Sequence, residues 1–277
     1  MSYAFRIVNV FTVPGQRLSG NPLCVFEDAR GLDDAQMQAL ALQMNLSETT
    51  FVVPATSSAA TARVRIFTPT MEMPFAGHPT LGTAHVIAAG ADRVTLELPA
   101  GLVPVVRDGG AWTLRAAKAP TSRRHDAPPA ELARALGLPA DAIGGEPRWV
   151  DTGVEQLVVP LRSPADVLAA KPDAALIDQH AFLPARGEAM IYAVAGDQVR
   201  FFFTAHGSVI EDPATGSACA NLGGYLLETG ASLPLERTLN QGAAVGRPSR
   251  LQLRVAVDRS IYVTGTVVDL ARGELDL

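Results

Sequence analysis

Two segments of this chain share the pattern Glu-x-Pro-x-x-Gly. The first runs from Glu72 to Gly77 and the second from Glu211 to Gly216. Each follows an apolar, strand-like stretch that contains Val-Arg, and each runs on into small residues typical of a helix. Glycine and proline also recur by chance, because they punctuate turns. The matching strand and helix context nevertheless favours a duplicated unit of strand, sharp turn and helix.

The expected start of each helix is a natural place for an anion. The first turn of a helix presents backbone N–H groups that have no partner within the helix, and the helix dipole adds partial positive charge there. Glycine at Gly77 and Gly216 lets a ligand approach the backbone closely, because it has no Cβ. Two copies of the unit predict two similar halves whose helix starts converge on one ligand.

Composition excludes several classes of protein. The 277 residues are 48% hydrophobic and 18% charged, as expected for one large or two ordinary globular domains. The net charge of −5 and the lack of a basic run argue against nucleic-acid binding. No apolar stretch approaches the roughly 20 residues that span a bilayer, and the first residues lack the pattern of a signal peptide. We therefore expect a cytoplasmic protein that binds neither nucleic acid nor membrane.

The order of the expected elements favours an α+β protein. Short alternating strands recur along the chain, as at 5–11 and 94–98, with one long helix in each half. This order differs from the regular strand–helix alternation of a doubly wound sheet. The polar, proline-rich stretch 118–129 is the best candidate for a linker. We therefore predict domains 1–119 and 120–277, with the C-terminal strand as a candidate for crossing back to the first domain.

Five polar residues stand out as candidates for a site. His78 and Ser217 directly follow the two glycines at the helix starts, and Asp212 precedes the second start. Glu48 lies between a predicted helix and a β-branched strand, where Glu is mildly disfavoured. On its own it is best interpreted as a solvated carboxylate that caps a turn. Asn21 precedes a proline, a position more typical of a turn former than of a site residue.

Taken together, four motifs in this order resemble those of the PhzF family of phenazine-biosynthesis-type isomerases. The motifs are 45–49 (Asn-Leu-Ser-Glu-Thr), 77–82 (Gly-His-Pro-Thr-Leu-Gly), 211–218 (Glu-Asp-Pro-Ala-Thr-Gly-Ser-Ala) and 241–249, and residues 9–12 and 20–22 match the N-terminal pattern. The resemblance covers nearly the whole chain. It implies a diaminopimelate epimerase-like fold of two pseudo-symmetric domains, each a mostly antiparallel sheet wrapped around a central helix. It also implies an active site in the cleft between the domains, and a homodimer.

The wider superfamily contains epimerases and racemases that use two opposed cysteines, one at the start of each central helix. The matching positions here are Gly77 and Gly216, which can neither remove nor deliver a proton. Cys24 and Cys219 lie elsewhere and form neither a disulfide framework nor a metal-ligand pattern. We expect both to be small core residues. Racemisation by two thiols is therefore excluded on chemical grounds.

The resemblance assigns proton transfer to a single carboxylate, Glu48. An isomerase that moves a proton between two carbons on one face of its substrate needs one shuttle, and partial burial that raises the pKa of the shuttle would help. His78, Asp212, Ser217 and Asn21 would bind and orient the substrate. Backbone N–H groups at the two glycines would receive a carboxylate or an enolate-like charge. No metal and no organic cofactor is needed.

We therefore expect an isomerase that acts on a small metabolite bearing a carboxylate. The best-known reaction of the family is the isomerisation of trans-2,3-dihydro-3-hydroxyanthranilate, and nothing in the sequence selects this substrate over others. Within enzymes, the alternative is an amino-acid racemase or epimerase, against which the paired glycines argue. Outside enzymes, the alternative is a protein that keeps the site to bind a small molecule without turnover.

Overall fold

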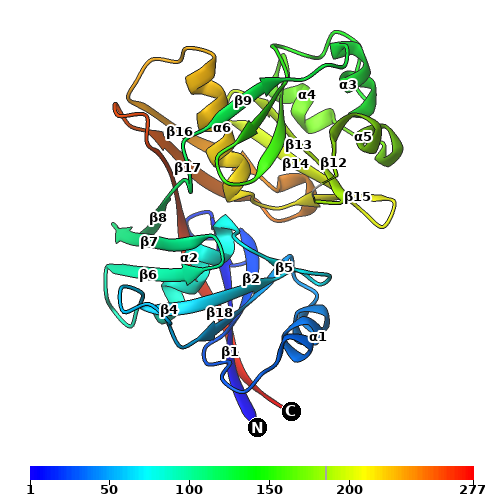
Figure 1. The fold of residues 1–277 in the computed structure, drawn as a ribbon. Coiled ribbons are helices and arrows are strands. Elements are labelled where there is room, and N and C mark those ends of the chain that lie inside the picture. The colour runs from blue at the N-terminus through cyan, green and yellow to red at the C-terminus, as the bar shows by residue number, and fades with distance from the viewer. Residues whose placement is uncertain (185) are drawn as a thin grey trace. The chain divides into compact units, whose positions relative to one another are not determined.

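The computed structural model describes residues 1–184 and 186–277, which divide into two compact units (Figure 1). Unit 1 comprises Met1–Ala117 and Tyr262–Leu277, and unit 2 comprises Lys118–Ile261. Unit 2 is therefore one continuous segment of the chain, whereas unit 1 is assembled from two segments. Among the described residues, no helix combines the length and the apolar character needed to cross a membrane.

Unit 1 is a closed β-barrel with one helix inside and one outside. Its elements are β1 (Ser2–Val10), β2 (Asn21–Phe26), α1 (Asp34–Met44), β3 (Glu48–Val53), β4 (Ala62–Phe67), β5 (Glu72–Met73), α2 (Gly77–Ile87), β6 (Arg93–Leu98), β7 (Gly101–Asp108), β8 (Ala111–Arg115) and β18 (Ile261–Asp276). The barrel pairings run β1–β2–β3–β4–β6–β7–β8–β18 and return from β18 to β1. The β2–β3 and β4–β6 pairs are parallel, and the others in this ring are antiparallel. Closure leaves the ring without an unpaired edge.

Helix α2 runs through the barrel of unit 1 and contacts β1, β2, β3, β6, β7 and β8. Nine of its 11 residues are buried. Small residues make this close fit possible: a Cβ on Gly82 would lie 2.6 Å from Cδ2 of Leu23 and 2.9 Å from Cγ2 of Val10. The small residues that predicted this helix therefore also allow strands to surround it.

Helix α1 packs on the outside of the barrel. Asp33 caps its start by accepting from the Gln36 N–H, and the Gln36 side chain accepts in return from the Asp33 N–H. Met37 and Leu40 face the barrel and pack with Phe51 in one hydrophobic cluster. A capping box therefore fixes the start of this helix.

Unit 2 wraps strands around helix α6. Its elements are β9 (Thr121–Arg124), α3 (Pro129–Ala135), β10 (Arg148–Asp151), β11 (Glu155–Pro160), α4 (Pro164–Ala169), α5 (Ala174–Ala181), β12 (Phe182–Leu183), β13 (Glu188–Ala195), β14 (Gln198–Ala205), β15 (Ser208–Asp212), α6 (Gly216–Glu228), β16 (Leu235–Gln241), η1 (Ala243–Val245) and β17 (Ser249–Val255). The pairings run β9–β10–β11–β13–β14–β16–β17, and β15 pairs with β14. Helix α6 contacts β9, β10, β11 and β17, and α4 and α5 pack against β13 and β14.

The two units repeat one order of elements. In unit 1 the order β3–β4–β5–α2–β6 contains a parallel β4–β6 pair, and in unit 2 the order β13–β14–β15–α6–β16 contains a parallel β14–β16 pair. The registers of the short hairpins also agree, because Phe67 lies opposite Glu72 and Phe202 lies opposite Glu211. The repeated sequence pattern therefore marks a repeated structural unit.

The stretch predicted to be a linker is not one throughout. Thr121–Arg124 forms β9, which pairs antiparallel with β10. Three of its four residues are exposed and none is apolar. The strand therefore carries no hydrophobic alternation by which the sequence could have predicted it.

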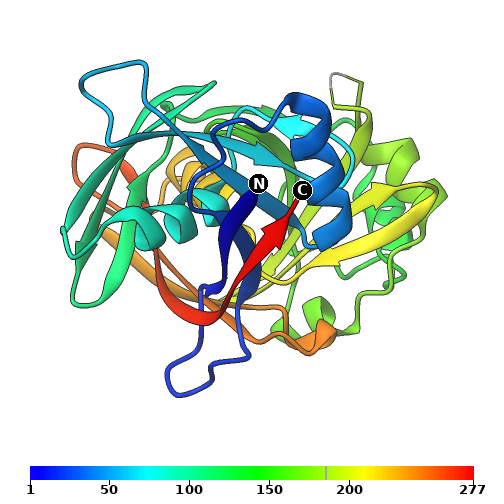
Figure 2. The ribbon, with the colours of Figure 1, turned by 90° about the horizontal axis from the view of Figure 1, so that it is seen from below.

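The strands β1 and β18 lie side by side, as the view from below shows (Figure 2). Their pairing brings the ends of the chain together, and the Leu277 N–H donates to the Met1 carbonyl at 3.0 Å. The antiparallel register shifts between Ile7 and Val8. Unit 1 is thus closed by a strand that follows all of unit 2 in the sequence.

Candidate active site

Four polar side chains of unit 1 meet beside the start of α2. Glu48 begins β3, Asn21 begins the neighbouring parallel strand β2, and His78 is the second residue of α2. Oε2 of Glu48 lies 3.6 Å from Nε2 of His78. Nδ2 of Asn21 lies 3.5 Å from Nδ1 of His78, and the Ser47 hydroxyl donates to Oδ1 of Asn21 at 3.4 Å. The parallel strands and the helix start thus bring the predicted acid and histidine together.

Burial makes His78 a neutral residue. Its side chain is 5% exposed and that of Glu48 is 15% exposed. Burial lowers the pKa of His78 from 6.5 to about 3, although a hydrogen bond to the Pro22 backbone opposes this shift. At neutral pH the contact therefore joins a carboxyl group to a neutral imidazole and is not a salt bridge.

The bond to Pro22 indicates which nitrogen of His78 carries the proton. The backbone of a proline can only accept, so the ring must donate to its carbonyl. Among the described residues Nε2 has no hydrogen-bond partner, which leaves Nδ1 as the donor. Nδ2 of Asn21 is also a donor, and its distance of 3.5 Å from Nδ1 is at the outer limit of a hydrogen bond. Nε2 thus turns a lone pair toward Glu48, and it can accept a hydrogen bond from the acid form of that side chain.

Neither central helix is capped by a side chain at its start. The residue before α2 is Ala76, whose methyl group cannot accept a hydrogen bond. The residue before α6 is Thr215, whose hydroxyl donates to Asp212 and does not cap the helix. The first-turn N–H groups at Gly77 and Gly216 therefore meet no capping side chain, as an anion-binding helix start requires.

A network around Gln241 holds the start of α6. The Gln241 amide donates to the Asp212 carbonyl at 2.9 Å and to the Thr215 hydroxyl at 3.0 Å. Its carbonyl accepts from the Thr215 N–H at 3.2 Å. Gly242 follows with φ of 77°, and a Cβ there would lie 2.4 Å from the Pro213 carbonyl oxygen. The turn before α6 is therefore fixed by a buried glutamine and by a position that only glycine fits.

A second network positions Ser217. The Gln156 amide donates to the Ser217 hydroxyl at 3.0 Å. Asn221 in turn donates to the side-chain carbonyl of Gln156 and to the Val154 carbonyl, both at 2.8 Å, and accepts from Thr152. Because Ser217 is the acceptor in the bond from Gln156, its own hydroxyl proton can be donated to a ligand.

The predicted site residues fall into two groups. Unit 1 contains Glu48, His78 and Asn21 in one cluster, and unit 2 contains Asp212 and Ser217 at the start of α6. The two glycines are the first residues of α2 and α6, as expected. The roles assigned to all these residues stay predictions.

Sequence reasoning missed the residues that support Ser217. Gln156 and Asn221 are 2% and 0% exposed although they lie in an apolar strand and in a helix of small residues. The signal by which sequence could have found them is a polar residue within an otherwise apolar element. In the sequence, Gln241 stands out only as part of a motif, and nothing local indicates that it bonds to the turn 26 residues earlier.

The two cysteines are buried and free, as expected for core residues. Burial raises the pKa of the Cys24 thiol to about 12 and raises that of Cys219 further. In the part of the chain that the structure describes, no three His, Cys, Asp or Glu side chains gather as they would around a metal ion.

Comparison with known proteins decides the family. The family model described as "Phenazine biosynthesis-like protein" (PhzC-PhzF) matches residues 8–273. The chain belongs to this family. A Pasteurella multocida protein named as an uncharacterized isomerase is 38% identical over 278 residues, which cover 99% of this chain and 94% of that protein. The trans-2,3-dihydro-3-hydroxyanthranilate isomerase of Pseudomonas aeruginosa is 37% identical over 288 residues, or 97% of this chain and 98% of that enzyme.

The fold of the PhzF family is shown as well. The crystal structure of a PhzF family protein from Bacillus anthracis matches with a TM-score of 0.86 at 25% identity, and the match covers 100% of both chains. The resemblance read from the four motifs is therefore confirmed, and so is the expectation of an enzyme of the isomerase class.

Proposed function

We propose that this PhzF-family isomerase moves one proton between two carbons of a small, unsaturated or cyclic carboxylate, with Glu48 as the shuttle. The observation that carries this proposal is the contact of the largely buried Glu48 carboxyl with the neutral ring of His78, 3.6 Å away. Of the cluster formed with Ser47 and Asn21, Glu48 is the one acid, and His78 stays neutral near pH 7. A group that both takes up and returns a proton must therefore be Glu48.

His78 supports Glu48 while Glu48 carries the proton. With the proton on Nδ1, Nε2 accepts a hydrogen bond from the acid form of Glu48 and orients it. The neighbouring start of α2, which follows Ala76, offers backbone N–H groups to the negative charge that develops on the substrate once the proton has left.

We also propose that the start of α6 acts on the same substrate. The family resemblance implies this role for Asp212 and Ser217. Two observations support it. The Ser217 hydroxyl accepts from Gln156, which leaves its own proton for donation to a ligand, and Gln241 fixes the turn that carries Asp212. A cytoplasmic homodimer is a further part of the proposal, and light scattering of the purified protein tests the dimer.

The substrate class is a carboxylate with an acidic C–H bond. trans-2,3-Dihydro-3-hydroxyanthranilate is the first compound to test, because a relative named for its isomerisation is 37% identical. The relative that is 38% identical carries the name of an isomerase and of no substrate. The test compounds should therefore include other small cyclic and unsaturated amino acids.

The decisive experiment replaces Glu48 by Gln, which keeps the shape of the side chain but cannot carry the proton. We expect Glu48→Gln to lower solvent-deuterium incorporation into the turned-over compound by about 10² to 10⁴-fold. Calorimetric affinity for the same compound should change by only a few-fold. Glu274→Gln, on the exposed part of β18, is the matched control and should behave like the wild type.

Other outcomes separate the alternatives. Full deuterium exchange by Glu48→Gln would contradict the assignment of the shuttle. Formation of the mirror-image or epimeric product by the wild type would make the protein a racemase or epimerase. Tight binding of several carboxylates without any exchange would make it a binding module.

A further inference from the structure

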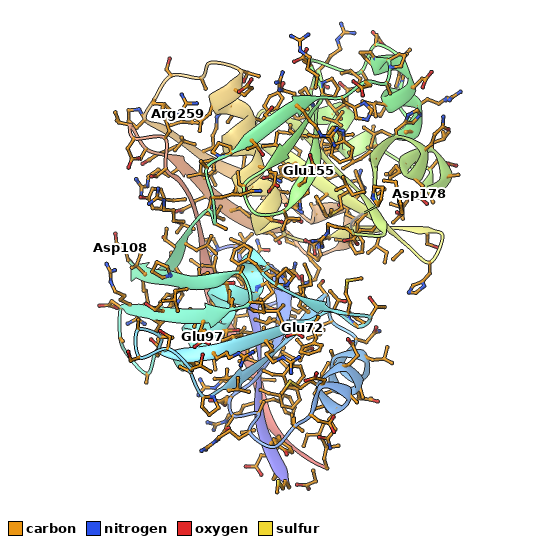
Figure 3. All side chains as sticks on the ribbon, in the orientation of Figure 1. Glu72, Glu97, Asp108, Glu155, Asp178 and Arg259 are labelled. Carbon is orange, nitrogen blue, oxygen red and sulfur yellow. The ribbon has the colours of Figure 1, made fainter. Side chains whose placement is uncertain are left out.

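An arginine–glutamate pair braces the hairpin before the central helix of unit 1. Nε and Nη2 of Arg65 on β4 donate to the two carboxylate oxygens of Glu72 on β5 at 2.7 and 2.6 Å, and Figure 3 labels this glutamate. The guanidinium lies 5.0 Å from the ring centroid of Phe67. Its third nitrogen, Nη1, donates to Asp34 in the first turn of α1 at 2.5 Å. One guanidinium thus connects the hairpin to α1, the helix between the parallel strands β2 and β3.

Unit 2 contains the same arrangement. Nε and Nη2 of Arg200 on β14 donate to the two oxygens of Glu211 on β15 at 3.1 and 2.6 Å. The guanidinium lies 4.7 Å from the ring centroid of Phe202. Nη1 donates to the Ala170 carbonyl at 2.8 Å and to two further carbonyls at the end of α4. Here too, one guanidinium connects the hairpin to a helix, α4, that lies between two parallel strands, β11 and β13.

We propose that these two Arg–Glu clamps, Arg65–Glu72 and Arg200–Glu211, are positioning residues that fix the starts of α2 and α6. Each glutamate stands directly opposite the aromatic residue of its hairpin and five residues before the first residue of the helix. The inference rests on the proposed function, because it assigns the clamps to the groups that the proposed reaction uses. It also explains why glutamate keeps its offset from glycine in both copies.

The geometry of β15 shows how the clamp of unit 2 acts on the site. Glu211 and Asp212 are adjacent on a strand, so their side chains point to opposite faces. Glu211 is held by Arg200 on one face, and Asp212 accepts from Thr215 on the other. A shift of the clamped residue is therefore passed on through one peptide unit to the predicted substrate-binding residue.

The two clamps differ in burial, and this predicts unequal effects. The side chains of Arg200 and Glu211 are 10% and 8% exposed, whereas those of Arg65 and Glu72 are 17% and 33% exposed. Solvent screens a buried pair less, and loss of one partner leaves the other charge uncompensated. Arg65 also keeps its bond to Asp34 when Glu72 is replaced. Glu211→Gln should therefore have a larger effect than Glu72→Gln.

The first measurement is amide hydrogen exchange, which needs no substrate. The Thr215 N–H donates to Gln241, and the Cys219 N–H makes the first backbone bond of α6. In Glu211→Gln we expect both amides to exchange about 10-fold faster or more. The Thr229 amide at the far end of α6 should keep its rate and serves as an internal reference, because it separates local loosening from global unfolding.

The second measurement separates positioning from mere stability. Leu132→Ala removes a buried side chain of α3, which packs on α5, and is the control for lost stability. At a temperature at which both variants are folded, we expect Glu211→Gln to lower kcat/KM at least 10-fold with a raised KM. Leu132→Ala should retain the wild-type value. The pH profile should keep its shape in both, because Glu48 is untouched.

Two results would overturn the proposal. One is Glu211→Gln with wild-type exchange at Thr215 and Cys219. The other is faster exchange with a kcat/KM no lower than that of Leu132→Ala, which would leave the clamp with a structural role alone. Lack of any isomerase activity in the wild type would instead refute the proposed function, and the exchange measurement would still decide whether the clamp fixes the helix start.

Discussion

At the scale of single residues, burial decides the state of His78. The folded protein lowers the pKa of this side chain from 6.5 to about 3, mainly because the charged ring would lose its water. Between these two values the unfolded chain binds a proton that the folded chain does not. The contribution of His78 to the free energy of unfolding is therefore complete above about pH 6.5 and declines as the pH falls toward 3.

The pH dependence of the free energy of unfolding leads to a prediction for His78→Asn. Removing the titrating group should make the decline in the free energy of unfolding below pH 6.5 shallower, by up to about 1.4 kcal/mol per pH unit. Urea denaturation at pH 7, 6, 5 and 4 measures this slope. His206→Asn is the matched control, since His206 is exposed and has a φ of 52° that Asn tolerates. Equal slopes in wild type and His78→Asn would contradict the prediction.

Sequence could predict the site residues that belong to a local pattern and few of the others. The two glycines at the helix starts and the cap at Asp33 were predictable from spacing, because helix ends have local signals. Glu48 needed the family resemblance, since its role depends on His78, which is 30 residues away. The bond between Gln156 and Asn221 spans 65 residues and leaves no trace in local spacing.

At the scale of elements, the close packing of strands around α2 depends on Gly82, although glycine is a poor helix former. Gly82 is buried in the helix, and a Cβ there would lie 2.6, 2.9 and 3.2 Å from the side chains of Leu23, Val10 and Val8. Alanine is the better helix former by about 1 kcal/mol, whereas overpacking a core costs about 1–3 kcal/mol. The cost of the clash should therefore exceed the gain in helix propensity.

We therefore expect Gly82→Ala to lower the free energy of unfolding, measured by urea denaturation. Gln43→Ala, on the exposed side of α1, gains helix propensity without a clash and should change stability by no more than about 0.5 kcal/mol. A more stable Gly82→Ala variant would show that the barrel around α2 can expand. Loss of isomerase activity without loss of stability would point to a shift of the helix start instead.

Sequence predicts the elements that carry a clear signal, which is a hydrophobic period for the strands and a glycine turn followed by small residues for α2 and α6. The short exposed strand β9 carries neither signal. The closure of the barrel could not be derived from any local pattern either, because β18 pairs with β1 at one side and with β8 at the other. Such pairings depend on contacts between distant parts of the chain.

At the scale of the whole molecule, the two units differ in the number of chain segments from which each is built. Lys118–Ile261 makes unit 2 from one segment, whereas unit 1 needs β18 to close its barrel. We therefore expect residues 118–261 to fold when expressed alone, with cooperative thermal unfolding by circular dichroism. Residues 1–117 alone should lack such a transition, because the edges of β1 and β8 would be exposed. A cooperative transition of the isolated 1–117 segment would contradict this expectation.

The late position of β18 also sets an order of events on the ribosome. Protein synthesis delivers β1 first, yet its partner β18 emerges only after all of unit 2 has been translated. At about 5–20 residues per second, the nascent barrel waits on the order of ten seconds with one edge of β1 and one edge of β8 unpaired. During that interval the open edges can pair with other chains, which is the kind of exposure that chaperones limit. A premature stop codon before β18 would leave both edges open permanently, and the truncated product would be prone to aggregation.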